Sequence, residues 1–307
     1  MIKIPVVVFG LGRIGMLYGL DEKRTQPASH IECILNNSNF DLVGVSDLSK
    51  NYRQKFLKNY NEICNVFDSH LELLQFLKKS KINPKIFVIA TPDKTHFKII
   101  NDIVQTFGRI TEKSIIFCEK PLTNDLESAK KVQKLLINSN YNLIVNHTRR
   151  WSIIWNLCNS EIRKIGNIEH AIFNFSTSPE NTSIDQMRDG IHIADLINWY
   201  GIKDNIHVNR FHLPYLVYDF HIWGDKGKID VLNNGQTFSL YKKNKSNRFT
   251  GFYELVLQRK TKTRDLPLKN AYSEFANFFK KNNIKLSTNL SDALESIKTF
   301  KSHVYKK

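Results

Sequence analysis

The sequence of 307 residues lacks the patterns that define several classes of protein. Its four cysteines (Cys33, Cys64, Cys118 and Cys158) lie far apart and form no CxxC pair, which argues against a zinc site and against a secreted disulfide framework. The apolar run at residues 4–9 is too short for the core of a signal peptide or for a membrane span. The chain contains no internal repeat and no low-complexity linker. We therefore expect a soluble, cytoplasmic protein with no membrane partner.

Positive charge is in excess, but it is not concentrated. The chain has 45 Lys and Arg against 29 Asp and Glu, and the resulting net charge of +16 would permit binding to nucleic acid or to an anionic substrate. The lysines are scattered, however, and there is no arginine-rich arm, so we expect no nucleic-acid partner. We also expect no metal site, because no ligand spacing relates the histidines of the second half: His170, His207, His212, His221 and His303.

The first half alternates short apolar segments with amphipathic helical patterns. The strand candidates are residues 6–10, 42–46, 86–90, 115–118 and 143–146, and apolar helical stripes cover residues 97–107 and 126–136. Short apolar strands that alternate with amphipathic helices predict an α/β domain with a doubly wound parallel sheet of the Rossmann type.

From Trp151 onward the pattern changes to long alternating segments. The strand candidates here are residues 168–177, 217–223, 238–241 and 252–258, with helices expected at 191–200, 272–281 and 292–305. Strands with segregated helices predict an α+β domain on a mainly antiparallel, open sheet. We therefore expect a dinucleotide-binding domain over residues 1–148. Residues 149–307 would form a domain for substrate binding and oligomerisation.

A glycine motif, Gly10-Leu-Gly12-Arg13-Ile14-Gly15, follows the first strand directly and is expected to open a helix. In this setting Gly10 makes the tight turn, Gly12 lets a pyrophosphate approach the backbone, and Gly15 lets the helix pack on the strand. The start of the helix would supply free N–H groups and a positive dipole end. The motif therefore predicts a dinucleotide site formed by these residues, Arg13 and Ile14 included.

Asp47 ends the second strand, where a carboxylate is expected to bind the ribose hydroxyls. Its distance from Gly15 is longer than usual, and a second helical stretch at residues 31–36 accounts for the excess. A carboxylate at this position favours NAD because it would repel the 2′-phosphate of NADP. NADP stays possible because Lys50 and Arg53 lie close by.

The stretch Ile115-Ile116-Phe117-Cys118-Glu119-Lys120-Pro121 reads as a buried strand that ends in charged residues. Because burying a charge is costly, Glu119 and Lys120 should lie at the exit of the strand, and Pro121 should turn the chain there. Asn124 is expected to cap the next helix, with Glu127 as its capping-box partner. A lysine at the carboxyl end of a parallel strand lies where open α/β sheets bind ligands.

The motifs occur along the chain in an order that resembles the Gfo/Idh/MocA oxidoreductases. These are NAD(P)-dependent enzymes that mostly act on sugars, sugar nucleotides and inositols. Besides GLGRIG and Ser46-Asp47, the resemblance rests on ATPDKTH (residues 90–96), CEKP (118–121), NHTRRW (146–151) and DGIHIADLINW (189–199). It covers nearly the whole chain.

The resemblance implies a hydride transfer between a nicotinamide cofactor and a secondary alcohol or ketone. Lys120 and His192 would be the catalytic residues: His192, near the start of its helix, as general base, and Lys120 as the group that stabilises the alkoxide. A cis bond would join Lys120 to Pro121. Thr91, Pro92, His96 and Glu119 would belong to the cofactor site, although Glu119 could instead orient the turn or the lysine.

Several residues on the substrate side have two interpretations. Arg149, Arg150 and Trp151 could grip an anionic substrate or form a salt bridge between domains. Asp195 could orient His192 or be structural. Arg188 stands where many family members have aspartate. Arg188 could bind an anionic group of the substrate while Asp189, also expected on the substrate side, or Asp195 supports His192. Alternatively, Arg188 could mark a degraded site.

Two functional hypotheses follow from these interpretations. The first is a dehydrogenase for a sugar, sugar nucleotide or polyol, assembled as a homodimer or homotetramer. The second is a catalytically silent member that senses nucleotides or sugars.

Overall fold

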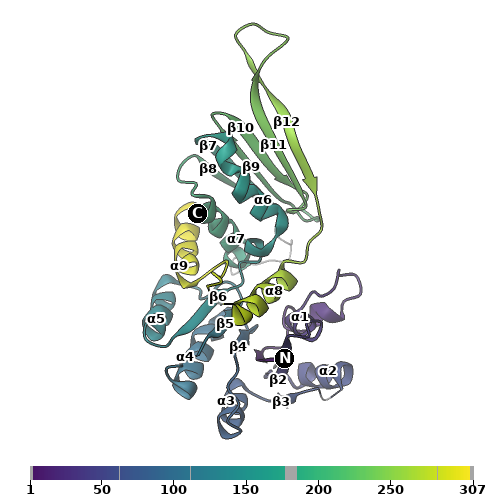
Figure 1. Cartoon of the computed structure of the whole chain (residues 1–307), viewed down its shortest axis with the longest axis vertical. Coiled ribbons are helices and arrows are strands. Elements are labelled where there is room, and N and C mark those ends of the chain that lie inside the picture. Colours follow the sequence, from purple (N-terminus) through teal and green to yellow (C-terminus); the bar gives the residue numbers. More distant parts are fainter. Residues whose placement is uncertain (1–2, 62, 111, 177–184, 282, 305–307) are drawn as a thin grey trace. The chain divides into compact units, whose positions relative to one another are not determined.

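A computed structural model describes residues 3–61, 63–110, 112–176, 185–281 and 283–304 (Figure 1). The chain divides into two compact units. The first consists of residues 1–148 and 266–294, and the second of residues 149–265 and 295–307. Residues 266–294, which we assigned from the sequence to the second domain, therefore pack in the first unit.

The first unit contains a parallel sheet of six strands in the order β3-β2-β1-β4-β5-β6. The strands are β1 (Ile4–Phe9), β2 (Phe40–Ser46), β3 (Asn65–Phe67), β4 (Ile86–Ile89), β5 (Ser114–Cys118) and β6 (Tyr141–Val145). The strand order reverses between β1 and β4, and in such sheets the ligand crevice lies at this point, beyond the carboxyl ends of the strands. The predicted doubly wound sheet is confirmed.

Most helices of the first unit follow a residue whose side chain caps them, and the helices that begin at His96 and Pro267 do not. The helices are α1 (His30–Leu35), α2 (Lys50–Tyr60), α3 (His70–Lys79), α4 (His96–Phe107), α5 (Leu126–Leu136) and α8 (Pro267–Lys280). Helix α5 is capped by Asp125, whose side chain accepts a hydrogen bond from Ser128 N, and not by Asn124 as predicted. Asn124 is one residue too early, since Asp125 is the extended residue directly before the first helical turn.

Helix α8 belongs to the first unit because of its aromatic side chains. Tyr272 and Phe275 are fully buried and make edge-to-face contacts with Phe117 of β5, at centroid distances of 5.9 and 4.8 Å. Tyr272 also meets Phe40 of β2 edge-on at 5.6 Å. Large aromatic side chains bury more area than most residues, so these contacts hold the late segment against the early sheet.

The second unit is built on a mixed sheet in the order β12-β11-β10-β9-β7-β8. Its strands are β7 (Ile168–Ser176), β8 (Ile206–Phe211), β9 (Tyr218–Gly224), β10 (Gly227–Leu232), β11 (Thr237–Lys245) and β12 (Tyr253–Lys262). Only β7 and β8 pair in parallel, and the other neighbours are antiparallel. This confirms the predicted second domain with a mainly antiparallel sheet.

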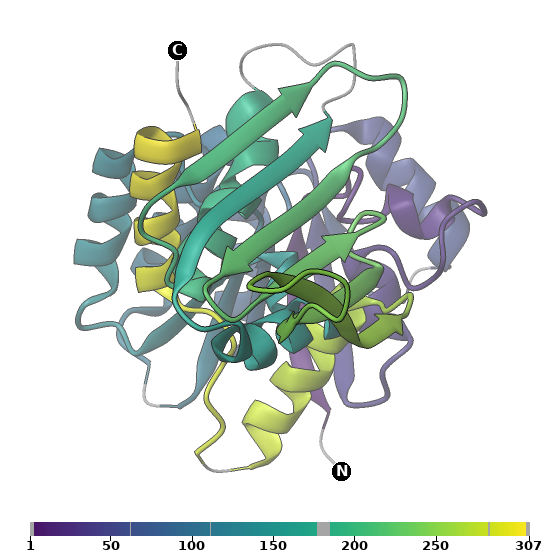
Figure 2. The same cartoon turned by 90° about the horizontal axis from the view of Figure 1, so that it is seen from above.

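One face of the mixed sheet is covered by α6 (Ile153–Glu161) and α7 (Asp185–Tyr200). Trp155 and Tyr200 on these helices stack near Phe220 of β9, which itself stacks on Phe173 of β7 at 4.0 Å. The alternate residues of the strands point to the other face. Figure 2 looks onto that face, and no helix of the described residues covers it. The chain ends with α9 (Leu290–Thr299) and a π-helical turn (Phe300–Val304).

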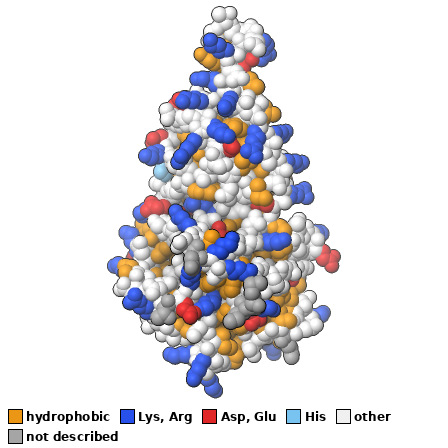
Figure 3. Space-filling view, in the orientation of Figure 1, with side chains coloured by type: hydrophobic (Ala, Val, Ile, Leu, Met, Phe, Trp, Pro, Cys, Tyr) orange, Lys and Arg blue, Asp and Glu red, His pale blue; other side chains and the backbone are white. Residues whose placement is uncertain are grey.

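The surface carries cations in many places. Figure 3 shows Lys and Arg side chains spread over the face in view and interspersed with neutral and acidic residues. In the described part of the chain, no helix is long and apolar enough to cross a bilayer.

Candidate functional site

The glycine loop leaves β1 at its carboxyl end. Gly10 has φ +99°, and a Cβ added to it would lie 2.6 Å from the carbonyl oxygen of Ala90. A Cβ on Gly15 would overlap the carbonyl oxygen of Gly10. The chain itself therefore requires glycine at these two positions. Gly12 differs, because a Cβ there would meet no atom within 4 Å. The space before Gly12 is open, as the approach of a pyrophosphate requires.

The helix expected after the loop does not form. The N–H groups of Met16 and Leu17 both donate to Gly12 O, at 2.9 and 3.0 Å, and the chain continues as a 3₁₀ turn over Leu17–Leu20. Gly19 lies against the side chains of Ser29 and Glu32, at the start of α1. Glycine is a weak helix former, and Gly19 packs closely against α1. The chain therefore has room only for a short 3₁₀ turn here.

Free N–H groups nevertheless remain in the loop. Leu11 N donates to Asp47 Oδ2 at 2.7 Å, but no described residue accepts a hydrogen bond from the N–H of Gly12, Arg13 or Ile14. Successive free N–H groups form a concavity that binds anions. The loop therefore fits a dinucleotide pyrophosphate even without the predicted helix.

Asp47 connects the end of β2 to this loop. Its Oδ2 accepts from Leu11 N and its Oδ1 from Ser49 N, both at 2.7 Å. Each carboxylate oxygen can accept a further hydrogen bond, so capacity remains for ribose hydroxyls. Arg53 donates to the carbonyl oxygens of Asp47 and Leu48, at 2.7 and 3.0 Å, and pairs with Asp68 at 2.9 Å. The guanidinium of Arg53, beside Asp47, is thus already bound by oxygen atoms of the protein itself.

Glu119 is the centre of a buried hydrogen-bond network below the turn at Lys120. Its Oε1 lies 3.0 Å from Nε2 of His30 and accepts from Asn146 Nδ2 at 2.6 Å. Nδ1 of His30 lies 2.9 Å from the hydroxyl of Tyr272 on α8, and His30 is 1% exposed. Nε2–H of His30 donates to the ionised Glu119, and Nδ1 then accepts from Tyr272 in the neutral imidazole or donates to it in the imidazolium. His30 and Tyr272 are not among the predicted site residues, since no local pattern in the sequence marks them.

The charge of Glu119 is maintained by this network. Burial alone would raise the pKa of the Glu119 carboxyl. The hydrogen bond and charge of His30, the hydrogen bond of Asn146 and the charge of Lys120 outweigh burial and hold that pKa below its usual range. Lys120 is half-buried and joined to Pro121 by a cis peptide bond, as the resemblance implies. Of its two interpretations, the contacts of Glu119 favour the one in which it orients the turn.

His96 is fully buried at the start of α4 and connects two loops. Its Nε2 lies 2.9 Å from the carbonyl oxygen of Thr91, and its Nδ1 lies 3.0 Å from that of Pro121. The segment containing Thr91 and Pro92 and the turn after Lys120 are therefore held together through one imidazole. His96 is thus placed to position both loops.

His192 lies in α7, is 8% exposed, and stands two turns from the helix start rather than near it as predicted. The helix begins earlier because Gly190 does not interrupt it. A Cβ at Gly190 would lie 2.7 Å from Phe300, so glycine is needed for close packing against the last turn of the chain. Arg188 and Asp189 precede His192 by one turn and are partly exposed.

Arg150 and Asp195 form an ion pair inside the second unit. Arg150 Nε and Nη2 donate to the two carboxylate oxygens of Asp195, at 2.9 and 2.8 Å, with side-chain exposures of 6% and 1%. The guanidinium also lies 4.7 Å from the ring centroid of Trp199. Arg150 therefore has a salt bridge, but one within the second unit and not between domains, and the contacts favour the structural interpretation of Asp195. Arg149 differs, since its guanidinium lies 3.8 Å above the ring of Tyr218, while Trp151 is buried.

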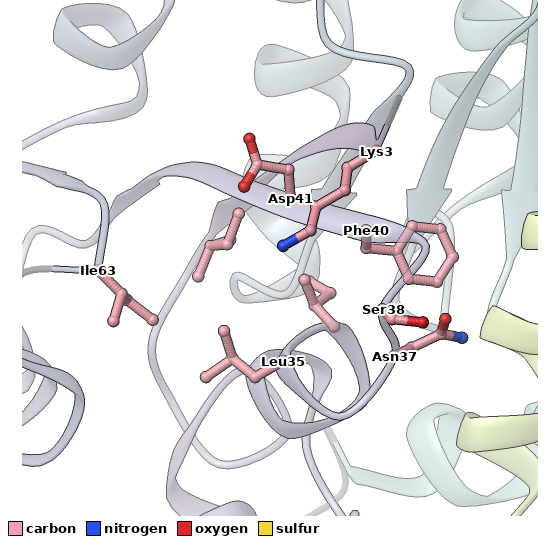
Figure 4. Close-up of a pocket in the computed structure, with 9 residues that line it drawn as sticks. Lys3, Leu35, Asn37, Ser38, Phe40, Asp41 and Ile63 are labelled. Atoms are coloured by element: carbon pink, nitrogen blue, oxygen red, sulfur yellow. The ribbon is translucent and has the colours of Figure 1, made fainter. Parts of the chain in front are cut away.

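A cavity of about 240 Å³ lies elsewhere, as Figure 4 shows. Its lining comes from the N-terminal ends of β1 and β2 and from the segments beside them: Lys3, Ile34, Leu35, Asn37, Ser38, Phe40, Asp41, Leu42 and Ile63. Ligands of open α/β sheets bind at the opposite, carboxyl edge. The cavity is therefore separate from the candidate site. Among the described residues, no group of three or more His, Cys, Asp or Glu could hold a metal ion.

The parallel sheet in Rossmann order, the open glycine loop and the carboxylate at the end of β2 are the features of a dinucleotide-binding fold. Residues 4–147 match the model of the Gfo/Idh/MocA oxidoreductase family, which is described as an NAD-binding Rossmann fold. Over these residues the chain matches the family, and the resemblance found in the sequence is confirmed there.

Solved structures extend the likeness to the second unit. The WlbA dehydrogenase from Bordetella pertussis, in complex with NADH and UDP-GlcNAcA, has a TM-score of 0.71 at 17% identity, with 99% of this chain and 96% of that chain covered. The UDP-N-acetylglucosamine 3-dehydrogenase GnnA from Acidithiobacillus ferrooxidans has 0.70 at 17%, covering 99% and 98%. The transcriptional regulator Gal80p from Kluyveromyces lactis has 0.72 at 13%, covering 99% and 89%. At these identities the likeness shows a shared fold. No curated protein sequence matches the chain.

Proposed function

We propose that the protein is an NAD-dependent oxidoreductase that transfers a hydride between the cofactor and a secondary alcohol or ketone of a sugar, sugar nucleotide or related polyol. The observation that carries the proposal is the glycine loop, where the N–H groups of Gly12, Arg13 and Ile14 have no acceptor among the described residues and Gly12 faces open space. The first unit would bind the cofactor and the second the substrate.

The chemistry is divided between the cofactor and two side chains. When bound, NAD supplies the hydride acceptor. We propose that His192 takes the proton of the substrate hydroxyl as general base and that Lys120 donates a hydrogen bond to the same oxygen. The network of Glu119, His30 and Asn146 would hold the turn that carries Lys120.

Nucleotide sugars are the substrates to test first. Structures with the same fold include a dehydrogenase bound to UDP-GlcNAcA and a UDP-N-acetylglucosamine dehydrogenase. Arg149 and Arg188 are partly exposed cations of the second unit, and guanidinium groups bind phosphate and carboxylate well. The test is a screen of nucleotide sugars, free sugars and inositols for a substrate-dependent change in NAD(H) absorbance, with NADP(H) in parallel.

The rival function is a sensor that binds nucleotide or sugar without turnover. Arg188, in place of the aspartate of many family members, and the fold shared with the regulator Gal80p favour it. Calorimetric titration separates the two functions. Binding of NADH and of a nucleotide sugar without any turnover would favour the sensor, whereas turnover with any member of the screen would exclude it.

NADH is expected to bind more tightly than NADPH, because the carboxylate of Asp47 would repel a 2′-phosphate and Arg53 is held by protein acceptors. Asp47→Asn keeps an oxygen for Leu11 N but removes the charge. It should narrow the ratio of the two dissociation constants by about tenfold, since like charges in contact are strongly unfavourable. Asp47→Ala should narrow it too.

The measurement is fluorescence titration of both reduced cofactors. Asp41→Asn, an exposed aspartate at the other end of β2, is the matched control and should leave the ratio unchanged. Equal affinities for NADH and NADPH in the parent protein would contradict the assignment of Asp47.

We also propose that the uncovered face of the mixed sheet is an interface in a homodimer or homotetramer. On that face, the apolar and aromatic side chains Ile172, Trp223 and Tyr241 lie between polar residues. Sedimentation velocity should give a mass that is a multiple of one chain, and Trp223→Glu should shift it toward one chain by placing a charge at the interface. A parent protein that sediments as a single chain would remove the proposal.

A further inference from the structure

The hydroxyl of Tyr218, the first residue of β9, is buried and has no hydrogen-bond partner among the described residues. The residue as a whole is 9% exposed. A buried polar group without a partner destabilises the folded state, and native structures contain few of them. The presence of a hydroxyl at position 218 therefore needs a physical explanation.

Packing does not supply that reason. The ring of Tyr218 lies below the guanidinium of Arg149 at 3.8 Å and meets the ring of Trp155 edge-on at a centroid distance of 5.9 Å. Phenylalanine would keep the aromatic ring for both contacts. The side chain is thus a tyrosine at a position where the described neighbours use only its ring.

Other buried tyrosine hydroxyls behave differently. Tyr200 donates to the carbonyl oxygen of Trp155 at 2.9 Å, and Tyr272 lies 2.9 Å from His30. Tyr141 is the exception, because its buried hydroxyl also lacks a partner among the described residues. Tyr141 begins β6, at the amino-terminal edge of the parallel sheet, and thus lies away from the carboxyl edge where such sheets bind ligands.

Two of the charges around Tyr218, Arg149 and Asp189, belong to residues already considered as substrate ligands. Burial, together with the carboxylates of Asp195 and Asp189 and against the opposing charge of Arg149, raises the pKa of Tyr218 to about 12. The hydroxyl is therefore protonated at neutral pH and can donate. Asp189 precedes His192 by one turn of α7, so the environment of Tyr218 includes the helix that carries the proposed base.

We propose that Tyr218 is a substrate-binding residue whose hydroxyl donates a hydrogen bond to an oxygen of the substrate. The cation of Arg149, stacked on the same ring, favours a phosphate or carboxylate on that substrate. The proposal rests on the proposed function, because it assigns the hydroxyl to a ligand of the sugar or sugar-nucleotide class.

Three conservative variants test the proposal: Tyr218→Phe, Tyr200→Phe and Tyr141→Phe. Each removes one buried hydroxyl and keeps the ring. The probes are UDP-N-acetylglucosamine, UDP-GlcNAcA and myo-inositol, titrated calorimetrically into the protein saturated with NADH. Stability is measured as the midpoint of thermal unfolding by circular dichroism, so binding and folding are read independently.

Tyr218→Phe is expected to weaken binding of the recognised probe about tenfold, as for one lost hydrogen bond, and to leave the unfolding midpoint unchanged or higher. In turnover its KM should rise more than its kcat falls. Tyr200→Phe should lower the midpoint and leave binding unchanged, because it loses a satisfied bond within the fold. Tyr141→Phe should leave binding unchanged and the midpoint unchanged or higher, because its hydroxyl also lacks a partner among the described residues.

Two results would overturn the inference about Tyr218 while the proposed function stands. One is parent-like binding by Tyr218→Phe. The other is a midpoint lowered as much as in Tyr200→Phe, which would assign the hydroxyl to a structural partner such as an ordered water. A parent protein that binds NADH but none of the three probes would instead overturn the proposed substrate class, and this role of Tyr218 with it.

Discussion

Lys120→Ala is expected to lower kcat by roughly two to three powers of ten, as when one preorganised donor to a developing oxyanion is removed. The lysine stands at the end of β5, where the network of Glu119, His30 and Asn146 holds the turn. If Lys120 stabilises the alkoxide, its loss acts on the transition state, so kcat and kcat/KM should fall together.

The measurement is steady-state turnover with the substrate that the screen identifies, together with titration of NADH. Binding of NADH should be nearly unchanged, since the loop at Gly12 and the carboxylate of Asp47 are untouched. Lys130→Ala, an exposed lysine on the neighbouring helix α5, is the control and should behave as the parent does. Normal turnover in Lys120→Ala would make this lysine structural.

The sequence predicted those parts of the fold whose signals are local. Strands of the parallel sheet are buried on both faces, so they read as continuous apolar runs such as Ile86–Ile89, and their positions were found within a few residues. Strand β3 (Asn65–Phe67) is short and has no buried residue, and none is buried in β8 (Ile206–Phe211) either. Such segments have no apolar pattern strong enough to be recognised.

The placement of residues 266–294 could not be read from local pattern. A domain boundary inferred from the sequence assumes that each domain is continuous. Helix α8 instead packs with the first unit through contacts of Tyr272 and Phe275 with residues far earlier in the chain. The missing helix after the glycine loop has a similar cause, because the packing of Gly19 against Ser29 and Glu32 follows from tertiary structure.

The residues of the candidate site fall into the same two groups: those that a local motif predicts and those that only tertiary contacts reveal. The glycines, Asp47 and Lys120 were predicted because each lies at the end of a strand in a recognisable motif. His30 and Tyr218 were missed, since their importance lies in contacts between distant segments. Arg149 and Arg150 are neighbours in sequence and received the same interpretations. The structure separates them, because one guanidinium pairs with Asp195 and the other stacks on Tyr218.

Asp195→Ala is expected to lower the free energy of unfolding of the second unit by about 3–5 kcal/mol. The pair with Arg150 is bidentate and almost completely buried, so removing the carboxylate leaves a guanidinium in a low-dielectric environment. Urea unfolding followed by tryptophan fluorescence measures this unit specifically, because all four tryptophans lie within it: Trp151, Trp155, Trp199 and Trp223.

Glu295→Ala is the matched control, because it removes an ion pair of the same unit in which both partners are half-exposed. It should cost about 1 kcal/mol or less, as surface pairs do. The double variant Arg150→Met, Asp195→Leu should recover most of the loss of either single variant, because no unpaired charge remains buried. If the double variant lost the sum of the single losses, the two side chains would stabilise the unit independently. The instability of Asp195→Ala would then come from lost packing rather than from an isolated cation.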